Sequence, residues 1–161
     1  MSEGLCPSIP APSASGPSGT PEKVCAFVEG DIGAGKTTLI RAIRDHFADR
    51  YGLDVGCCPE PVELWADKLE SFYRGAISPG DLQDDIREFR IATFERAVSD
   101  RKTIQVFERS PLVSDQVFVL AQDLPADVVA AQTAKNEDQA ARVRGALSRY
   151  GYSTVVFAHL Q

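Results

Sequence analysis

Residues 30 to 38 read Gly30-Asp31-Ile32-Gly33-Ala34-Gly35-Lys36-Thr37-Thr38. This segment fits the pattern G-x-x-x-x-G-K-[ST], and it lies between an apolar run and an amphipathic helical pattern. Its glycines let successive backbone amides turn toward an anion, and the helix that begins near Lys36 adds the positive end of its dipole. A glycine-rich hairpin would need neither the strand before it nor the helix after it. The segment therefore predicts a loop whose nine residues bind the phosphates of a nucleotide.

Two side chains of this loop are expected to have separate roles. Lys36 is placed to reach the outer phosphates, and the hydroxyl of Thr37 to ligate a magnesium ion that bridges them. A kinase with these two residues would bind ATP and Mg²⁺, and we therefore expect both as ligands.

The sequence around the loop alternates between short β-rich runs and longer helical patterns, which is typical of a parallel sheet covered by helices. The expected strands are Val24 to Glu29, Leu53 to Cys58, Thr103 to Glu108 and Ser153 to Leu160. The expected helices follow the loop as far as Gly52, span Asp81 to Val98, and begin at Ser114. The fold class is therefore α/β, a three-layer sandwich with a parallel sheet. Cys57 and Cys58 should point to opposite faces of the second strand.

Residues 1–22 differ from the rest, because 15 of them are Ser, Pro, Gly or Ala. Such a segment buries little apolar surface, so we expect a flexible leader and a single domain over residues 23–161. The leader could be a docking tail or, more simply, a tolerated extension. It has neither the apolar run of a secretory signal nor the basic residues of a mitochondrial one.

Composition excludes several kinds of partner. The 161 residues include 17 basic and 23 acidic side chains, and the net charge of −6 disfavours binding to a nucleic-acid backbone. We find no transmembrane run and no cysteine spacing typical of zinc. We therefore expect a cytoplasmic protein that binds small molecules rather than nucleic acid or membranes.

Several enzyme classes share such a loop, and the rest of the sequence separates them. A GTPase would carry D-x-x-G directly after a strand and N-K-x-D later, and neither occurs here. The third strand ends instead in Phe107-Glu108-Arg109-Ser110. Because the carboxyl ends of parallel strands converge, Glu60, Glu108 and Arg109 can all face the loop. This arrangement favours a kinase that acts on a small alcohol.

These three residues have distinct expected roles in phosphoryl transfer. Glu60, held between two prolines, is the candidate base for the acceptor hydroxyl. Arg109 would hold the acceptor oxygen or the transferred phosphoryl group and pair with Glu60, and Glu108 would complete the magnesium shell. Two alternatives stay open: Glu60 could lie in a solvated loop, and Glu108 and Arg109 could form a structural ion pair.

Three segments resemble the cellular and viral deoxyribonucleoside kinases, namely residues 27–38, Pro59-Glu60-Pro61-Val62-Glu63-Leu64-Trp65, and Phe107-Glu108-Arg109-Ser110. Their order and separations also agree with that family. The resemblance implies a P-loop kinase fold and ATP-dependent phosphorylation of the 5′-hydroxyl of a deoxyribonucleoside. It also implies that Trp65 is a wall of the nucleoside pocket and that the protein is a homodimer.

The same resemblance assigns residues to the sugar and the base. Tyr73, with Phe72 as the alternative, would hydrogen-bond the sugar 3′-hydroxyl. Gln83 and Arg90 would read the base edge, where a glutamine amide suits a pyrimidine because it donates and accepts at once. The alternative for Gln83 and Arg90 is an exposed helix face.

The resemblance also assigns two residues that follow the third strand. Phe118 would stack on the base, with core packing as the alternative. Ser114 occupies a position that varies with base preference, so the preferred nucleoside stays open.

The resemblance also predicts what the chain lacks. Members of the family continue past the fourth strand into an arginine-rich lid and a fifth strand, whereas this chain ends at Gln161. We therefore expect a domain that is incomplete at its C-terminus. Two alternative functions remain, a nucleoside monophosphate kinase of similar fold and a lidless remnant that binds nucleotide without turnover.

Overall fold

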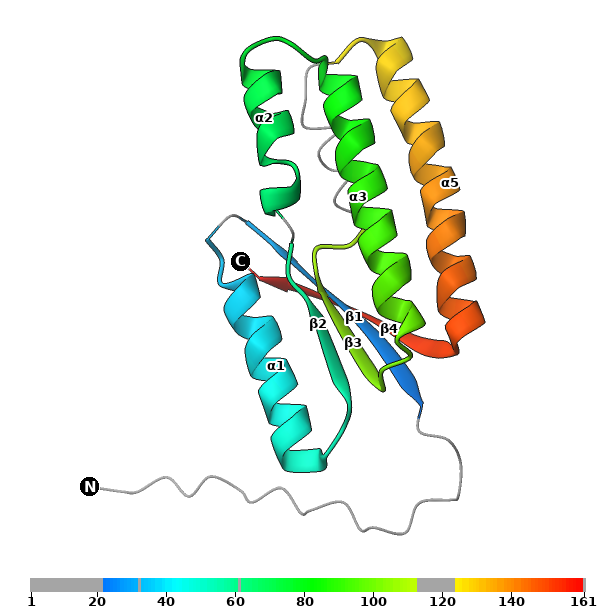
Figure 1. The fold of residues 1–161 in the computed structure, drawn as a ribbon. Helices are drawn as coiled ribbons and strands as arrows, with labels where there is room; N and C mark the ends of the chain where they lie inside the picture. Colours follow the sequence, from blue (N-terminus) through cyan, green and yellow to red (C-terminus); the bar gives the residue numbers. More distant parts are fainter. Residues whose placement is uncertain (1–21, 32, 61, 113–123, 161) are drawn as a thin grey trace, which may run out of the picture.

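The structure is a computed structural model that describes residues 22–31, 33–60, 62–112 and 124–160 (Figure 1). In chain order its elements are β1 (Lys23–Gly30), α1 (Lys36–Tyr51), β2 (Val55–Cys58), the 3₁₀ helix η1 (Val62–Leu64), α2 (Ala66–Tyr73), α3 (Pro79–Ser99), β3 (Ile104–Glu108), α5 (Ala126–Tyr150) and β4 (Tyr152–Leu160). All four predicted strands are present, with small shifts at their ends. The helix expected from Ser114 lies outside the described residues. None of the helices within the described ranges is long and apolar enough to cross a membrane.

The strands form one parallel sheet in the order β2-β3-β1-β4. Strand β1, which leads into the glycine-rich loop, therefore lies between β3 and β4. The register pairs Val28 of β1 with Glu108 of β3, and Cys58 of β2 with Phe107 of β3. The carboxyl ends of β1, β2 and β3 consequently meet at the same edge of the sheet, as predicted.

Helices cover both faces of this sheet (Figure 1). Val28 of β1 packs in a core with Ile40 of α1, whereas Phe27 packs on the opposite face with Phe94 of α3 and Val143 of α5. The alternation of side chains along β1 thus feeds two separate apolar cores. The predicted three-layer α/β sandwich is confirmed.

The side chains of strand β2 also alternate between the two faces of the sheet. Cys57 faces α1, where its Sγ donates to the carbonyl of Ile40 at 3.3 Å, and Cys58 packs against the core under α3. The predicted placement of the two cysteines on opposite faces is confirmed. Burial raises the pKa of the Cys58 thiol to about 11, so this thiol is protonated and weakly reactive at neutral pH.

Gly56 directly precedes Cys57 in β2 and packs against a buried side chain of β3. A methyl group on Gly56 would lie 2.2 Å from Oε1 of Gln105, whose side chain is 2% exposed. We expect Gly56→Ala to lower the free energy of unfolding by about 1–3 kcal/mol, because Gln105 has little room to move. Urea unfolding of Gly56→Ala, Gln105→Ala and the double variant measures this. The cost of Gly56→Ala should shrink in the Gln105→Ala background, and strict additivity would contradict the predicted clash.

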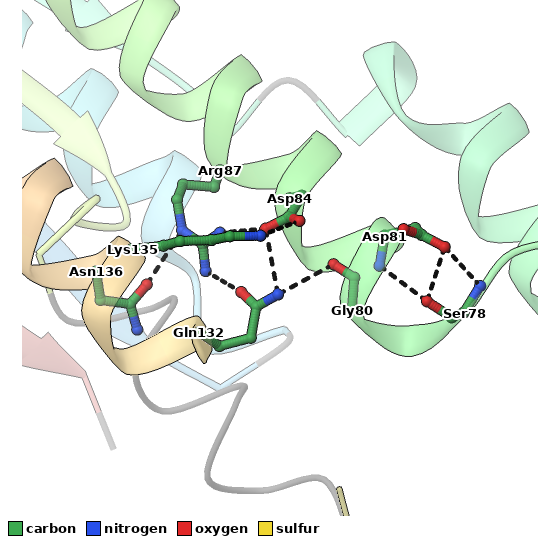
Figure 2. A network of polar contacts seen from close by, with 8 residues as sticks. All are labelled: Ser78, Gly80, Asp81, Asp84, Arg87, Gln132, Lys135 and Asn136. Carbon is green, nitrogen blue, oxygen red and sulfur yellow. Dashed lines mark hydrogen bonds and ion pairs between the residues drawn. The ribbon is translucent and has the colours of Figure 1, made fainter. Parts of the chain in front are cut away.

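Helix α3 begins at a capping box (Figure 2). The Oγ of Ser78 accepts from the backbone N–H of Asp81 at 3.1 Å, and the Asp81 carboxylate accepts from the backbone N–H of Ser78 at 3.3 Å. Pro79 occupies the first turn, where its missing N–H is harmless. These residues start α3 two positions before the predicted Asp81.

Helix α3 is joined to α5 by a polar network (Figure 2). The guanidinium of Arg87, which is 5% exposed, donates to Asp84 at 2.6 Å and to the side-chain oxygen of Asn136 at 3.1 Å, and also reaches Gln132. Lys135 forms an ion pair with Asp84. The network fixes how α5 lies along α3, the helix that carries Gln83 and Arg90.

Asp84 makes the polar network between α3 and α5 sensitive to acid. Burial by itself raises the pKa of the Asp84 carboxyl, but hydrogen bonds from Lys135, Gln132 and Arg87 together hold it below its ordinary value of 3.8. The folded state therefore favours the ionised form, and its contribution to stability is present above pH 3.8 and is lost as the pH falls below that value. We expect Asp84→Asn to lower the free energy of unfolding at pH 7 by about 1 kcal/mol.

Urea unfolding at pH 7 and pH 3 checks this prediction. The difference between Asp84→Asn and the unsubstituted protein should be smaller at pH 3, and a difference that grows toward acid would contradict it. Asp49→Asn, at an exposed position of α1, is the matched control and should change little at either pH.

Candidate active site

The glycine-rich loop leaves β1 and enters α1 through left-handed backbone. Gly33 and Gly35 have φ angles of 83° and 85°, and a methyl group on either would meet no atom within 4 Å among the described residues beyond its chain neighbours. The backbone conformation, and not crowding, therefore accounts for these glycines. α1 has no side-chain cap among the described residues, so the N–H groups of its first turn are available to an anion. Ile32, predicted to belong to the same loop, lies outside the described residues.

Lys36 is folded over this loop. Its side chain is buried, and its Nζ donates to the carbonyl oxygens of Gly30 at 3.1 Å and Asp31 at 2.7 Å. The backbone N–H of Ala34 bonds to the carbonyl of Asp31 at 3.2 Å, while the exposed Thr38 faces solvent at the start of α1. The ammonium group thus lies inside the cradle in which phosphate oxygens are predicted to bind.

The two residues predicted to hold magnesium contact each other. Oγ1 of Thr37 donates to Oε2 of Glu108 at 2.8 Å, and the backbone N–H of Glu60 approaches the same oxygen at 3.4 Å. A hydroxyl and a carboxylate next to a phosphate cradle are the hard oxygen donors that Mg²⁺ prefers. The predicted residues therefore fit a magnesium ion that would also take phosphate oxygens and water as ligands.

Glu60 lies between two guanidinium groups. Nε of Arg109 donates to Oε2 of Glu60 at 2.7 Å, and a terminal nitrogen of Arg90 donates to Oε1 at 2.7 Å. The Glu60 side chain is 13% exposed, so the alternative of a solvated loop is wrong. The predicted Arg109–Glu60 pair is present, and Glu108 bonds Thr37. The carboxylate is held in one orientation by contacts to both of its oxygens.

A single pocket joins the phosphate loop to Glu60. Its volume is about 540 Å³, within the range of small-molecule sites. It is lined by Gly33, Lys36, Glu60, Val62, Trp65, Leu69, Phe72, Tyr73, Leu82, Gln83, Ile86, Arg90, Glu108 and Arg109. A molecule in this pocket can reach the ammonium group at one end and the apolar wall formed by α2 and α3 at the other.

The apolar end of the pocket contains the predicted nucleoside residues. Trp65 is 3% exposed and packs with Leu82 and Ile86, and the Arg90 guanidinium lies 5.6 Å from the centre of its ring. Gln83 is 4% exposed, and its Oε1 accepts no hydrogen bond from any described residue. The alternative of an exposed helix face for Gln83 and Arg90 is therefore wrong.

Tyr73 and Phe72, the two candidates for the contact to the sugar 3′-hydroxyl, both lie at the rim of the pocket. Tyr73 is 80% exposed, Phe72 is half-buried, and their ring centres lie 5.6 Å apart. Both line the pocket. Ser114 and Phe118 lie outside the described residues, so their predicted roles stay predictions.

The chain leaves β3 at Arg109 through an unusual conformation. Arg109 has a φ of 68°, a left-handed value that costs an arginine of the order of 1–3 kcal/mol. Next to it, the backbone N–H of Ser110 donates to Oε1 of Glu29 at 2.6 Å. The sequence pattern predicts no role for Glu29. The available signal was a carboxylate at the end of an otherwise apolar strand, one residue before the loop.

Known proteins similar to this chain include nucleoside and nucleotide kinases. The family model described as deoxynucleoside kinase matches residues 26–134, a range that includes every predicted site residue. The thymidine kinase of Ictalurid herpesvirus 1 (strain Auburn) is 28% identical over 123 residues, which cover 73% of this chain and 52% of that protein. The chain thus spans about half the length of this relative. A solved thymidylate kinase from Ehrlichia chaffeensis superposes with a TM-score of 0.46 at 15% identity, over 86% of this chain and 88% of the other.

Proposed function

The chain belongs to the deoxynucleoside kinase family, and we propose that it transfers the γ-phosphoryl group of ATP to the 5′-hydroxyl of a deoxyribonucleoside. One observation carries this proposal: Lys36 and Glu60 line the same pocket, which extends into an apolar compartment walled by Trp65. An alcohol in that compartment can lie between a bound phosphate and a fixed carboxylate. The expected product, a deoxynucleoside monophosphate, would serve nucleotide salvage for DNA synthesis.

The reaction needs orientation, charge neutralisation and a base. As the 5′-oxygen bonds to the γ-phosphorus, the bond from that phosphorus to the β–γ bridging oxygen breaks, and Glu60 accepts the hydroxyl proton. Lys36 offsets negative charge on the β- and γ-phosphates. Arg109, already bonded to Glu60, lies where it can hold the acceptor oxygen or the moving phosphoryl group. A magnesium ion, when bound at Thr37 and Glu108, would neutralise charge on the phosphates.

The geometry favours a pyrimidine as the base of the acceptor. Gln83 is buried beside an apolar wall, and its Oε1 accepts no hydrogen bond within the described part of the chain. A buried oxygen without a donor is costly unless a ligand satisfies it. The amide of a pyrimidine base offers one donor and one acceptor side by side, which matches the Gln83 side chain. The similarity to a viral protein named thymidine kinase points the same way. The predicted homodimer and cytoplasmic location stay predictions.

Binding and turnover can be tested separately, because Trp65 is the single tryptophan of the chain. Its fluorescence should change on titration with thymidine or deoxycytidine, which measures binding without catalysis. Labelled ATP should then be supplied with each deoxynucleoside and each deoxynucleoside monophosphate, and the products separated.

The outcomes distinguish the three candidate functions. Phosphorylation of a pyrimidine deoxynucleoside supports the proposal. Phosphorylation of monophosphates alone would support a nucleoside monophosphate kinase, and binding without any product would support a nucleotide-binding remnant. Either of the last two results would overturn the proposed activity of this chain.

A further inference from the structure

The turn that follows β3 keeps an arginine where a glycine would fit the backbone more easily. Arg109 has a φ of 68°, a region in which glycine is favoured. A glycine at this position would relieve the backbone strain, but it would remove the guanidinium that bonds Glu60. The conformation therefore has to be imposed by the neighbours of the turn.

Within the described residues, four hydrogen bonds to backbone atoms hold residues 109–112, which we name the Arg109 turn. The backbone N–H of Arg109 bonds to the carbonyl of Val28 at 2.9 Å, Oγ of Ser110 accepts from the backbone N–H of Leu112 at 2.9 Å, and Gln139 of α5 donates to the carbonyl of Pro111 at 2.6 Å. The fourth is the bond from the backbone N–H of Ser110 to the carboxylate of Glu29, at 2.6 Å.

The bond to Glu29 differs from the other three backbone contacts. Among these four it is the one whose acceptor is a carboxylate, and charge-assisted hydrogen bonds are shorter and stronger than neutral ones. Ser110 is 0% exposed, so water does not replace this acceptor for its N–H group without opening the turn. The φ of Arg109 and the direction of the Ser110 N–H group are set by adjacent bonds of the backbone. Holding one of them constrains the other.

Glu29 also occupies a particular place along its own strand. It is the last side chain of β1, and Gly30, which begins the phosphate loop, follows directly. Its carboxylate therefore connects the strand that leads into the donor side of the pocket with the turn that presents Arg109 to Glu60. A change at Glu29 should therefore alter how the phosphate loop and Arg109 are aligned, and should change the affinities for ATP and for the acceptor less.

We propose that Glu29 is a positioning residue that locks the Arg109 turn through the Ser110 backbone and thereby keeps the guanidinium of Arg109 on Glu60. Its kinetic consequence rests on the proposed function, whereas its structural consequence does not. Glu29 touches neither phosphate nor acceptor in this role. It acts on the reaction through the orientation of Arg109.

Amide hydrogen exchange tests the structural part of the proposal without any requirement for activity. Exchange at Ser110, followed by NMR in the full chain, should be at least about tenfold faster in Glu29→Ala than in the unsubstituted protein. Glu29→Gln keeps an acceptor oxygen and should show a smaller increase. The matched control is Glu22→Ala, because Glu22 also bonds a neighbouring strand, through Ser153 and Thr154, but at the opposite end of β1. Unchanged exchange at Ser110 in Glu29→Ala would overturn the proposal.

Kinetics with ATP and a pyrimidine deoxynucleoside test how Glu29 acts. Glu29→Ala should lower kcat about 10–100-fold with KM for ATP changed less than about threefold, and Glu29→Gln should recover most of kcat. In an Arg109→Ala background, Glu29→Ala should have little further effect, because its route to the reaction is already removed. A full additional loss in that background would show that Glu29 does not act through Arg109.

The two proposals fail in different ways. If the unsubstituted protein phosphorylates no deoxynucleoside, the proposed function fails, and hydrogen exchange still decides whether Glu29 holds the turn. If the protein is active and exchange at Ser110 is indifferent to Glu29, the positioning role fails while the kinase assignment stands.

Discussion

Glu60→Gln is expected to lower kcat for deoxynucleoside phosphorylation by about 10²–10⁴-fold, the usual contribution of a general base. A glutamine has nearly the same shape but accepts no proton from the 5′-hydroxyl at neutral pH. Trp65 fluorescence should still report deoxynucleoside binding, because the apolar wall and Gln83 are unchanged. Steady-state kinetics and fluorescence titration of the same preparation measure the two effects.

The substitution also removes the negative charge between Arg90 and Arg109. Both guanidinium groups are largely buried, with side-chain exposures of 8% and 12%, so loss of their common anion should lower stability by about 3–5 kcal/mol. Assays therefore belong at temperatures well below the midpoint of thermal unfolding. Glu63→Gln, at an exposed position of η1, is the control and should keep both activity and stability. If Glu60→Gln retained activity within about threefold, Glu60 would not be the base.

Lys36→Met is expected to lower kcat/KM for ATP by about 10²–10³-fold, as removal of one charged donor to a transition state commonly does. Methionine has a similar length and fills the same buried space, so the loss reports the ammonium group and not a cavity. Affinity for the deoxynucleoside, measured through Trp65 without ATP, should change less than about threefold.

Lys102→Met provides the control for the lysine prediction. Lys102 lies just before β3, at the amino end of the sheet, where it pairs with Asp54 at 3.0 Å. Its replacement should leave kcat/KM for ATP unchanged. An equal loss of deoxynucleoside affinity in Lys36→Met would contradict separate donor and acceptor ends of the pocket.

The parts of the fold that depend on local pattern could be predicted from the sequence. The strand–loop–helix unit around Lys36, the four strands and the opposite orientations of Cys57 and Cys58 follow from periodicity and glycine placement. The convergence of Glu60, Glu108 and Arg109 followed from one general property, that parallel strands end at the same edge.

The parts that depend on tertiary packing could not be predicted from local pattern. Arg87 is surrounded by charges in the sequence, and two of its three partners among the described residues, Gln132 and Asn136, come from a helix that begins at Ala126. Burial of Gln83 likewise depends on how α2 packs against α3. The role of Glu29 was missed because it depends on the φ of Arg109, which no property of an arginine in the sequence indicates.

The two guanidinium contacts of Glu60 also affect the hydrolysis of ATP by water when no acceptor is bound. A carboxylate beside bound ATP can activate water as readily as an alcohol. The activated water would then hydrolyse ATP without phosphorylating an acceptor. With Arg90 on Oε1 and Arg109 on Oε2, the lone pairs of Glu60 are partly occupied before any acceptor arrives. A small, poorly oriented water competes weakly for such a site, whereas a nucleoside anchored along the Trp65 wall can displace one contact. Under the proposed function, we therefore expect the protein to hydrolyse ATP slowly when no acceptor is bound.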